Sequence, residues 1–296
     1  MAITTTSVIA DTIPTIIEEA KFTAQHKAIM KNLSWNITKK KGDGTTVNLP
    51  YWGTITAGAL TQGVDMASPT SMADTLVTYT PAEVGAQIIV TWKVARDNQE
   101  DVVRAAGVIL GNAMEVKRDQ DLLGQLDDGT TSLGGSGTTL TMGQIAAANA
   151  LLSGLAISSG GPAPTPRAAV HHPYVLLDLV DVLTPTVPGG TTPATTPGSM
   201  TDEVLRNYLM GRLFGINIYE DGNLDITTNA NSGKGGVFAT GRGGSLVLAT
   251  ADEWDVYPED DASLRATELN VVGEYGVGEY LAGWIVELFN DATTPA

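Results

Sequence analysis

An extended, strand-like segment that changes directly into a long helical one restricts the fold of this chain more than any other feature. Apolar and polar side chains alternate from Thr45 to Tyr51, and no lysine or arginine occurs between Gly42 and Trp92. At Lys93 to Glu100 the period changes from that of a strand to that of a helix. The sequence therefore predicts an arm of paired strands followed at once by one long helix, an order that is uncommon in enzymes.

The paired strands are predicted to form a long hairpin. A returning strand is expected at Leu76 to Tyr79 and again from Gln87 to Trp92, where β-branched and aromatic residues favour extended structure. The intervening residues, Ala57 to Ala73, are rich in glycine, serine and threonine, which favour turns and loops. We expect this intervening segment to be a tip that projects from the body of the protein.

The helix that follows is predicted to run from Asp97 to Asp127. Asp97 resembles an N-cap residue with Glu100 three residues later, an arrangement in which two side chains satisfy free amides at a helix start. Apolar residues then recur on one face until Asp128 and Gly129 end the pattern. At about 1.5 Å per residue, roughly 30 residues make a helix of about 45 Å, which can serve as the backbone of a flat, elongated domain.

The rest of the chain alternates between shorter helices and strands, so the predicted fold class is α+β. A short helix is expected between Pro14 and Ile29, and a Pro-rich loop over residues 184–199. The other predicted helices are residues 141–154, 173–183 and 201–209. The other predicted strands are residues 168–170, 215–219, 237–239, 245–249, 266–272 and 284–289.

The charge of the chain is strongly acidic and unevenly placed. The formal net charge of −16 excludes a general polyanion-binding surface, because phosphate contacts need clustered lysine and arginine. Residues 1–41 carry six lysines against three acidic residues, which leaves 11 basic against 30 acidic residues in 42–296. The chain has no cysteine, so disulfides and thiolate metal sites are excluded. No secretory signal or membrane span is expected, and the sequence is typical of a cytoplasmic product.

No catalytic, cofactor-binding or metal-binding residue is predicted. His171 and His172 are adjacent on an extended chain and point to opposite faces, so a structural role is favoured over a shared metal. The glycine-rich run Ser232 to Gly236 lacks the spacing of a phosphate loop. Acidic clusters at 127–128 and 259–261 match no calcium loop and are interpreted as solvated turns. Two alternatives stay open. One is an enzyme that uses His171 or His172, and the other is a β-rich phage tail protein or surface-binding protein.

The order of elements resembles the major capsid proteins of tailed bacteriophages, the Hong Kong phage type of capsid fold. The resemblance covers nearly the whole chain and rests on element order, not on an invariant motif. It is carried by the hairpin Thr45 to Trp92, the helix start Ala95 to Glu100, the Val170 to Pro173 turn into a helix, and the closing strand Glu268 to Gly273.

The resemblance implies a division of the chain into four parts. Residues 1–42 correspond to an N-terminal arm and 43–92 to the extended loop that reaches a neighbouring subunit. The long spine helix lies in a peripheral domain made of 93–135 and 245–282. Residues 136–244, with 283–296 as end strand and C-terminal tail, correspond to an axial domain.

The function implied by the resemblance is a self-assembling icosahedral shell of pentamers and hexamers around double-stranded DNA. The contacts between subunits are expected at Tyr51, Trp52, Met66, Met72, Lys39, Lys40 and Lys41. Since the loop offers no lysine, no isopeptide cross-link is expected. An encapsulin-type nanocompartment with an enzyme cargo is the alternative within the same fold.

The same resemblance implies the partners and the location of the protein. Its main partner is other copies of itself, and portal, scaffold or decoration proteins are expected as well. Contact with the packaged DNA is expected to be indirect, and neither a cofactor nor a membrane is expected to take part. The protein would be assembled in the host cytoplasm and reside in the virion capsid.

Overall fold

The computed structural model of the protein describes residues 28–40, 42, 44–55, 57–63, 71–97, 102–183 and 211–295, with side chains not described at 103, 104 and 180–183. Six predicted features lie wholly or mostly outside the described residues: the helix at 14–29, the loop at 184–199, the helix at 201–209, Met66, Lys41 and Glu100. The described strands form three sheets, and two short 3-10 helices lie at Ile157–Ser159 and Ala282–Trp284.

The described helices are α1 (Met30–Leu33), α2 (Trp92–Asp97), α3 (Val102–Gly124), α4 (Met142–Ser153) and α5 (Pro173–Leu183). The described strands are β1 (Trp35–Thr38), β2 (Val47–Trp52), β3 (Asp74–Tyr79), β4 (Ala82–Thr91), β5 (Thr131–Gly134), β6 (Arg167–His171), β7 (Arg212–Leu213), β8 (Ile216–Glu220), β9 (Ser232–Ala239), β10 (Leu246–Asp261), β11 (Ala266–Glu279) and β12 (Ile285–Asp291). The α+β class predicted from the sequence is confirmed.

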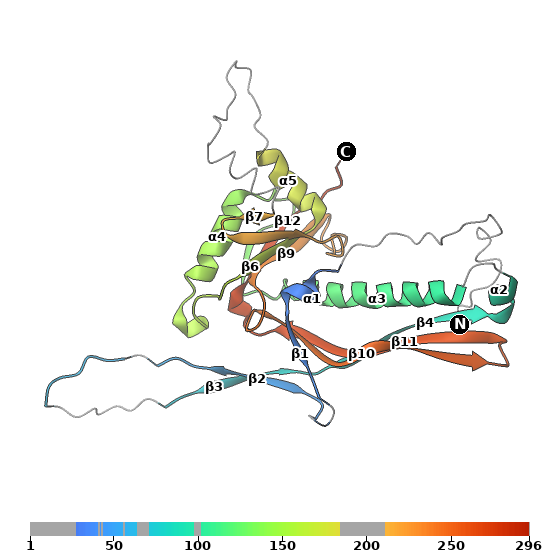
Figure 1. Ribbon diagram of the computed structural model, residues 1–296. Helices are drawn as coiled ribbons and strands as arrows, with labels where there is room; N and C mark the ends of the chain where they lie inside the picture. The colour runs from blue at the N-terminus through green and yellow to red at the C-terminus, as the bar shows by residue number, and fades with distance from the viewer. Residues whose placement is uncertain are drawn as a thin grey trace, which may run out of the picture.

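A four-stranded sheet supports the long helix α3. Its order is β1-β10-β11-β4, and α3 lies along one face of it (Figure 1). The helix is held there by a buried apolar cluster to which α3 contributes Leu110 and Met114, and the sheet contributes Val90, Leu269 and Val271. Side chains three or four residues apart share one face of a helix, so this apolar stripe is the one that the periodicity of the sequence indicates.

A six-stranded sheet, in the order β5-β12-β9-β6-β8-β7, forms the second body of the protein. Helices α4 and α5 pack on one face through Ile145, Leu152 and Leu179, which share a buried cluster with strand residues Val237 and Leu288. The start of α4 is fixed by a capping box between Thr141 and Gln144. The opposite face packs against α1 and the end of α3, in a second cluster formed by Met30, Leu122, Leu126, Val170 and Phe238.

The predicted hairpin is present as the two-stranded sheet of β2 and β3, which extends away from both bodies (Figure 1). The strands are antiparallel, with Val47 opposite Tyr79 and Trp52 opposite Asp74. β4, which was expected to continue the hairpin, instead pairs with β11 along its whole length, from Thr91 opposite Ala266 to Ala82 opposite Tyr275. The apolar residues Val84, Ala86 and Ile88 of β4 pack against the α3 cluster, which explains this partner.

The start of the long helix differs from the prediction. Trp92 begins α2 instead of ending a strand, and Asp97 is the last residue of α2 instead of a cap that precedes the first turn. α3 itself begins at Val102, and Glu100 lies outside the described residues. Val94 explains the early helical turn, because it is fully buried in the cluster beneath α3.

Besides the two-residue strand β7, three strands or parts of strands have no counterpart in the prediction. β1 pairs in parallel with β10, and β5 pairs in parallel with β12 where only a turn near Gly134 was expected. β10 also continues well beyond Ala249, so the acidic cluster at 259–261 lies in paired strand next to a turn. Each of these segments is short or polar, and it is extended because a distant strand supplies its hydrogen bonds.

Candidate assembly surfaces

The hairpin carries the largest concentration of exposed apolar side chains among the described residues. Leu60 and Met72 are each 71% exposed, and Trp52 is 58% exposed. Ile55 and Leu76, in the same hairpin, are more than half exposed as well. Soluble proteins rarely leave such a group uncovered, and a contiguous exposed apolar patch marks a surface that binds a partner.

The base of the hairpin is fixed to the body by four aromatic rings. The Tyr280 ring lies 5.6 Å from the ring of Trp35, 6.3 Å from that of Tyr51 and 6.2 Å from that of Trp284. The Tyr280 hydroxyl donates a hydrogen bond to the carbonyl oxygen of Pro50 at 3.0 Å. Burial, followed by the neighbouring Tyr51, raises the pKa of Tyr280. These contacts set the direction in which the hairpin leaves the body.

The predicted contact residues are therefore not all in one place. Trp52 and Met72 lie in the exposed part of the hairpin, whereas the Tyr51 ring contacts Tyr280 of its own chain. Lys39 and Lys40 follow β1, where the Lys39 amide donates to the Thr250 carbonyl oxygen at 2.8 Å. That these residues contact neighbouring subunits stays a prediction.

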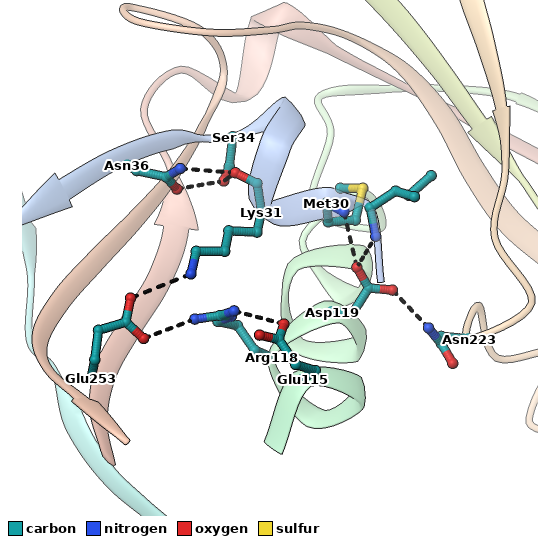
Figure 2. Close-up of polar contacts among 10 residues, drawn as sticks. Met30, Lys31, Ser34, Asn36, Glu115, Arg118, Asp119, Asn223 and Glu253 are labelled. Atoms are coloured by element: carbon teal, nitrogen blue, oxygen red, sulfur yellow. Dashed lines mark hydrogen bonds and ion pairs between the residues drawn. The ribbon is translucent and has the colours of Figure 1, made fainter. Parts of the chain in front are cut away.

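A buried carboxylate joins three parts of the chain, and sequence analysis missed it. Figure 2 shows Asp119 of α3 accepting hydrogen bonds from the amide of Met30, at 2.9 Å, and from Asn223 Nδ2, at 2.9 Å. Asp119 also accepts from the amide of Ile29 at 3.0 Å. Asp119 is only 2% exposed. It thus ties α1 and the loop after β8 to the spine helix.

The neighbouring Arg118 ties the same helix to the four-stranded sheet. Its guanidinium is buried and lies 2.7 Å from Glu115 and 3.3 Å from Glu253 (Figure 2). It also stacks 4.0 Å from the centre of the Trp254 ring. Planar stacking and forked hydrogen bonding together are a particular capacity of arginine, so lysine would not replace it.

A second carboxyl group, that of Asp221, is buried beside Asp119. One of its oxygens accepts from the Asn223 amide at 2.9 Å, and the other has no partner within the described residues. Burial, together with the nearby negative charge of Asp119, raises the pKa of Asp221 to about 8. The group is therefore protonated near neutral pH.

The protein is expected to lose stability as the pH rises from about 3.8 to about 8. Folded Asp221 holds a proton between its ordinary pKa of 3.8 and about 8, whereas the unfolded chain releases it, so the stabilisation present below pH 3.8 is lost as pH rises to about 8. Asp221→Asn keeps a neutral side chain at this site, so it should remove this pH dependence of the free energy of unfolding. The total change over the range is on the order of a few kcal/mol. Urea unfolding between about pH 6.5 and 9 measures it; equal slopes in both proteins would contradict the assignment.

That window is chosen because His171 acts in the opposite direction in acid. Burial lowers the pKa of His171 to about 4, so its contribution to stability falls as the pH drops below the ordinary value of 6.5. Neither ring nitrogen of His171 has a hydrogen-bond partner among the described residues. His172 accepts the amide proton of Tyr174 on Nδ1 at 3.2 Å, at the start of α5. Both histidines are thus packed at a strand-to-helix turn.

The other candidate sites also have local structural roles. Lys234 of the glycine-rich run pairs with Asp127 and lies 3.7 Å from Glu287, so its charge faces carboxylates. Asp261 accepts hydrogen bonds from Ser263 and Leu264 in the turn after β10. The described part of the chain holds no group of three or more metal-ligating side chains. None of its helices is long and apolar enough to cross a membrane.

Comparison with known proteins gives a family for this fold. The family model of the phage capsid protein matches residues 74–286. The capsid structure of cyanophage P-SCSP1u aligns over 97% of this chain and 95% of its own, at 15% identity and a TM-score of 0.69. A structure of Mycobacterium phage Che8 aligns over 93% of this chain and 96% of its own, at 17% identity and a TM-score of 0.68. The capsid structure of Helicobacter pylori bacteriophage KHP30 aligns over 99% of both chains, at 11% identity and a TM-score of 0.70.

No curated protein sequence matches the chain. At these identities the solved structures establish a shared fold, and the family model establishes relationship in sequence. The match begins at the first residue of β3 and ends within β12, so it covers most of both large sheets and the whole of the spine helix. The chain therefore belongs to the phage capsid protein family.

Proposed function

We propose that the chain is a major capsid protein whose copies assemble into an icosahedral shell around double-stranded DNA. The family match and the shared capsid fold support this role, and none of the relatives named above is an enzyme-storing nanocompartment. Within the shell the subunits would be grouped as pentamers and hexamers held without covalent cross-links. The role is structural and needs no catalytic group.

We also propose a division of labour within the subunit. The four-stranded sheet with α3 would form the peripheral domain, and the six-stranded sheet with α4 and α5 the axial domain. Strand pairing supports two changes to the boundaries expected from the sequence. β1 joins the peripheral sheet from the N-terminal arm, and β4 leaves the extended loop for the same sheet. The extended loop would then be the hairpin of β2 and β3 with its tip.

The exposed apolar hairpin is the single observation that carries the assembly proposal. The hairpin carries five large exposed apolar side chains and projects away from the body of its own subunit (Figure 1). A surface of another molecule is therefore needed to cover them. A neighbouring copy in a closed shell supplies such a surface many times over, and weak repeated contacts of this kind allow assembly errors to be corrected. Electron microscopy of the purified protein tests the proposal: closed shells whose subunits run as monomers on a denaturing gel support it.

Two substitutions in the hairpin should separate assembly from folding. The double variant Trp52→Asp and Met72→Asp removes exposed apolar surface and adds charge, so we expect assembly to fall at least about tenfold, with the subunit still folded. Light scattering and the far-ultraviolet circular dichroism spectrum measure the two properties. Thr54→Asp, at an exposed polar position of the same hairpin, is the matched control. Normal assembly of the double variant would contradict the role of the hairpin.

Other partners follow from the charge of the protein. The acidic residues of 42–296 would keep the packaged DNA from adhering to the shell wall. Portal, scaffold or decoration proteins would complete the particle, which we propose is assembled in the host cytoplasm. The lysine-rich residues 1–41 would face acidic surface on a neighbouring subunit, scaffold or genome.

A further inference from the structure

A strained aromatic residue stands at one end of the axial domain. Phe214 and Gly215 join β7 to β8, and both have a positive φ, of 50° and 82°. A two-residue hairpin turn with two positive φ angles favours asparagine, aspartate or glycine, whereas a bulky residue is strained there. The Phe214 side chain is nevertheless 49% exposed. A costly conformation that presents an aromatic ring to solvent is typical of a site of contact.

A groove lies at the other end of the same strand. It has a volume of about 890 Å³ and is formed between the end of α3, the start of α5 and the loop that follows β8. Its apolar lining consists of Leu123, Tyr174, Leu224 and Ile226, and Gln120 of α3 lies exposed at its edge. The space is ample for one phenyl ring.

Charge at the two ends is complementary. Arg212, two residues before Phe214, is exposed and forms no ion pair with any described residue. Asp225 is exposed in the lining of the groove. Hydrogen bonds from Thr228 and Thr227 lower the pKa of Asp225 to about 2, so its negative charge is maintained at any working pH. A partner that placed an arginine beside an aromatic ring would match this groove.

The two ends cannot meet within one subunit. Phe214 precedes β8 and the groove follows it, so the strand, of about 17 Å at 3.3 Å per residue, separates them. Complementary surfaces at two different places on one molecule join copies head to tail, and such contacts form a ring when the rotation between copies closes. We propose that Phe214 of one subunit inserts into the groove of the next subunit in the ring, with Arg212 facing Asp225. The inference rests on the proposed capsid function and specifies one contact within each capsomer.

Two variants test the contact from its two sides. Phe214→Asn removes the ring and relieves the turn, so the melting temperature of the subunit should stay equal or rise while ring and shell formation falls at least about tenfold. Gln120→Trp fills the groove from an exposed helix position and should have the same effect on assembly. Phe214→Tyr keeps the aromatic ring and should assemble normally. Normal assembly of both Phe214→Asn and Gln120→Trp would overturn the proposal.

Cross-linking distinguishes failure of this contact from failure of the capsid function. Because the chain has no cysteine, Arg212→Cys with Asp225→Cys introduces the only two thiols, at the positions proposed to face each other, and leaves the Phe214 ring in place. The loss of one exposed ion pair should affect assembly little. Assembled particles of the double variant, treated with a short bismaleimide, should give a ladder up to pentamers and hexamers on a denaturing gel, and each single variant should give no species above dimer. Shells without a ladder would reject the contact and leave the capsid function standing; absence of any shell in the unsubstituted protein would reject both.

Discussion

Gly235→Ala is expected to destabilise the protein strongly. Gly235 lies in β9, between β6 and β12 in the six-stranded sheet. A Cβ atom there would lie 2.4 Å from the carbonyl oxygen of Val170 and 2.5 Å from Nδ1 of His171. The first of these is backbone of a paired strand, which cannot move without breaking the ladder. We expect a loss of on the order of 3 kcal/mol or more, at the upper end of the effects of overpacking, out of a total of about 5–15 kcal/mol.

Soluble yield and the thermal unfolding curve measure this effect. Gly107→Ala is a matched control, because no atom lies within 4 Å of the Cβ position at Gly107 in α3. Since glycine in a helix is less favourable than alanine, the control should gain up to about 1 kcal/mol. If Gly235→Ala unfolded at the temperature of the unsubstituted protein, the close approach of β6 and β9 would be wrong.

Asp119→Ala is expected to have the second largest effect. The change leaves the amides of Ile29 and Met30 and the side-chain amide of Asn223 without their acceptor, in a site closed to water. Buried donors left unpaired cost about 1–3 kcal/mol each, and relaxation recovers part of this, so we expect a loss of about 3–4 kcal/mol. The N-terminal segment should also detach from α3, because Asp119 holds the first residues of α1.

Chemical denaturation gives the loss in stability, and limited proteolysis near α1 reports the detachment. Glu115→Ala is the control on the same helix, since it removes one partly exposed partner of Arg118 and should cost less than about 1 kcal/mol. The loss of the Asp119 carboxylate should also weaken the pH dependence that comes from Asp221. Equal stability of the Asp119 and Glu115 variants would show that the buried carboxylate is not the joint between these segments.

The sequence predicts those elements whose signal is local. α3 has a long helical periodicity, and the strands of the β2–β3 hairpin have alternating apolar side chains. The positions predicted for both elements are therefore close to the observed ones. β1 and β5 are short, and their strand geometry depends on partners more than 150 residues away in the chain. The acidic half of β10 has no apolar alternation and is extended because β11 pairs with it residue by residue.

The joint at Asp119 could not be predicted for the same reason. Its partners are backbone amides 89 and 90 residues earlier and a side chain 104 residues later, and none of them changes the local pattern of α3. The glycine-rich run that contains Gly235 is visible in the sequence, but its pattern does not indicate its structural role. It superficially resembles a phosphate loop, whereas its glycines allow the backbones of β6 and β12 to approach β9 closely.

The parallel pairing of β1 with β10 has a consequence for the timing of synthesis. Trp35 lies opposite Val247, so the sheet that supports the spine helix stays incomplete until the ribosome has made more than two hundred further residues. β12, between β5 and β9, is made later still, and Tyr280 at the base of the hairpin emerges only shortly before it. Contacts between such distant segments form slowly. A nascent chain therefore exposes its apolar hairpin early but lacks the body that orients it, so the orientation of the hairpin is fixed only after β12 has been made.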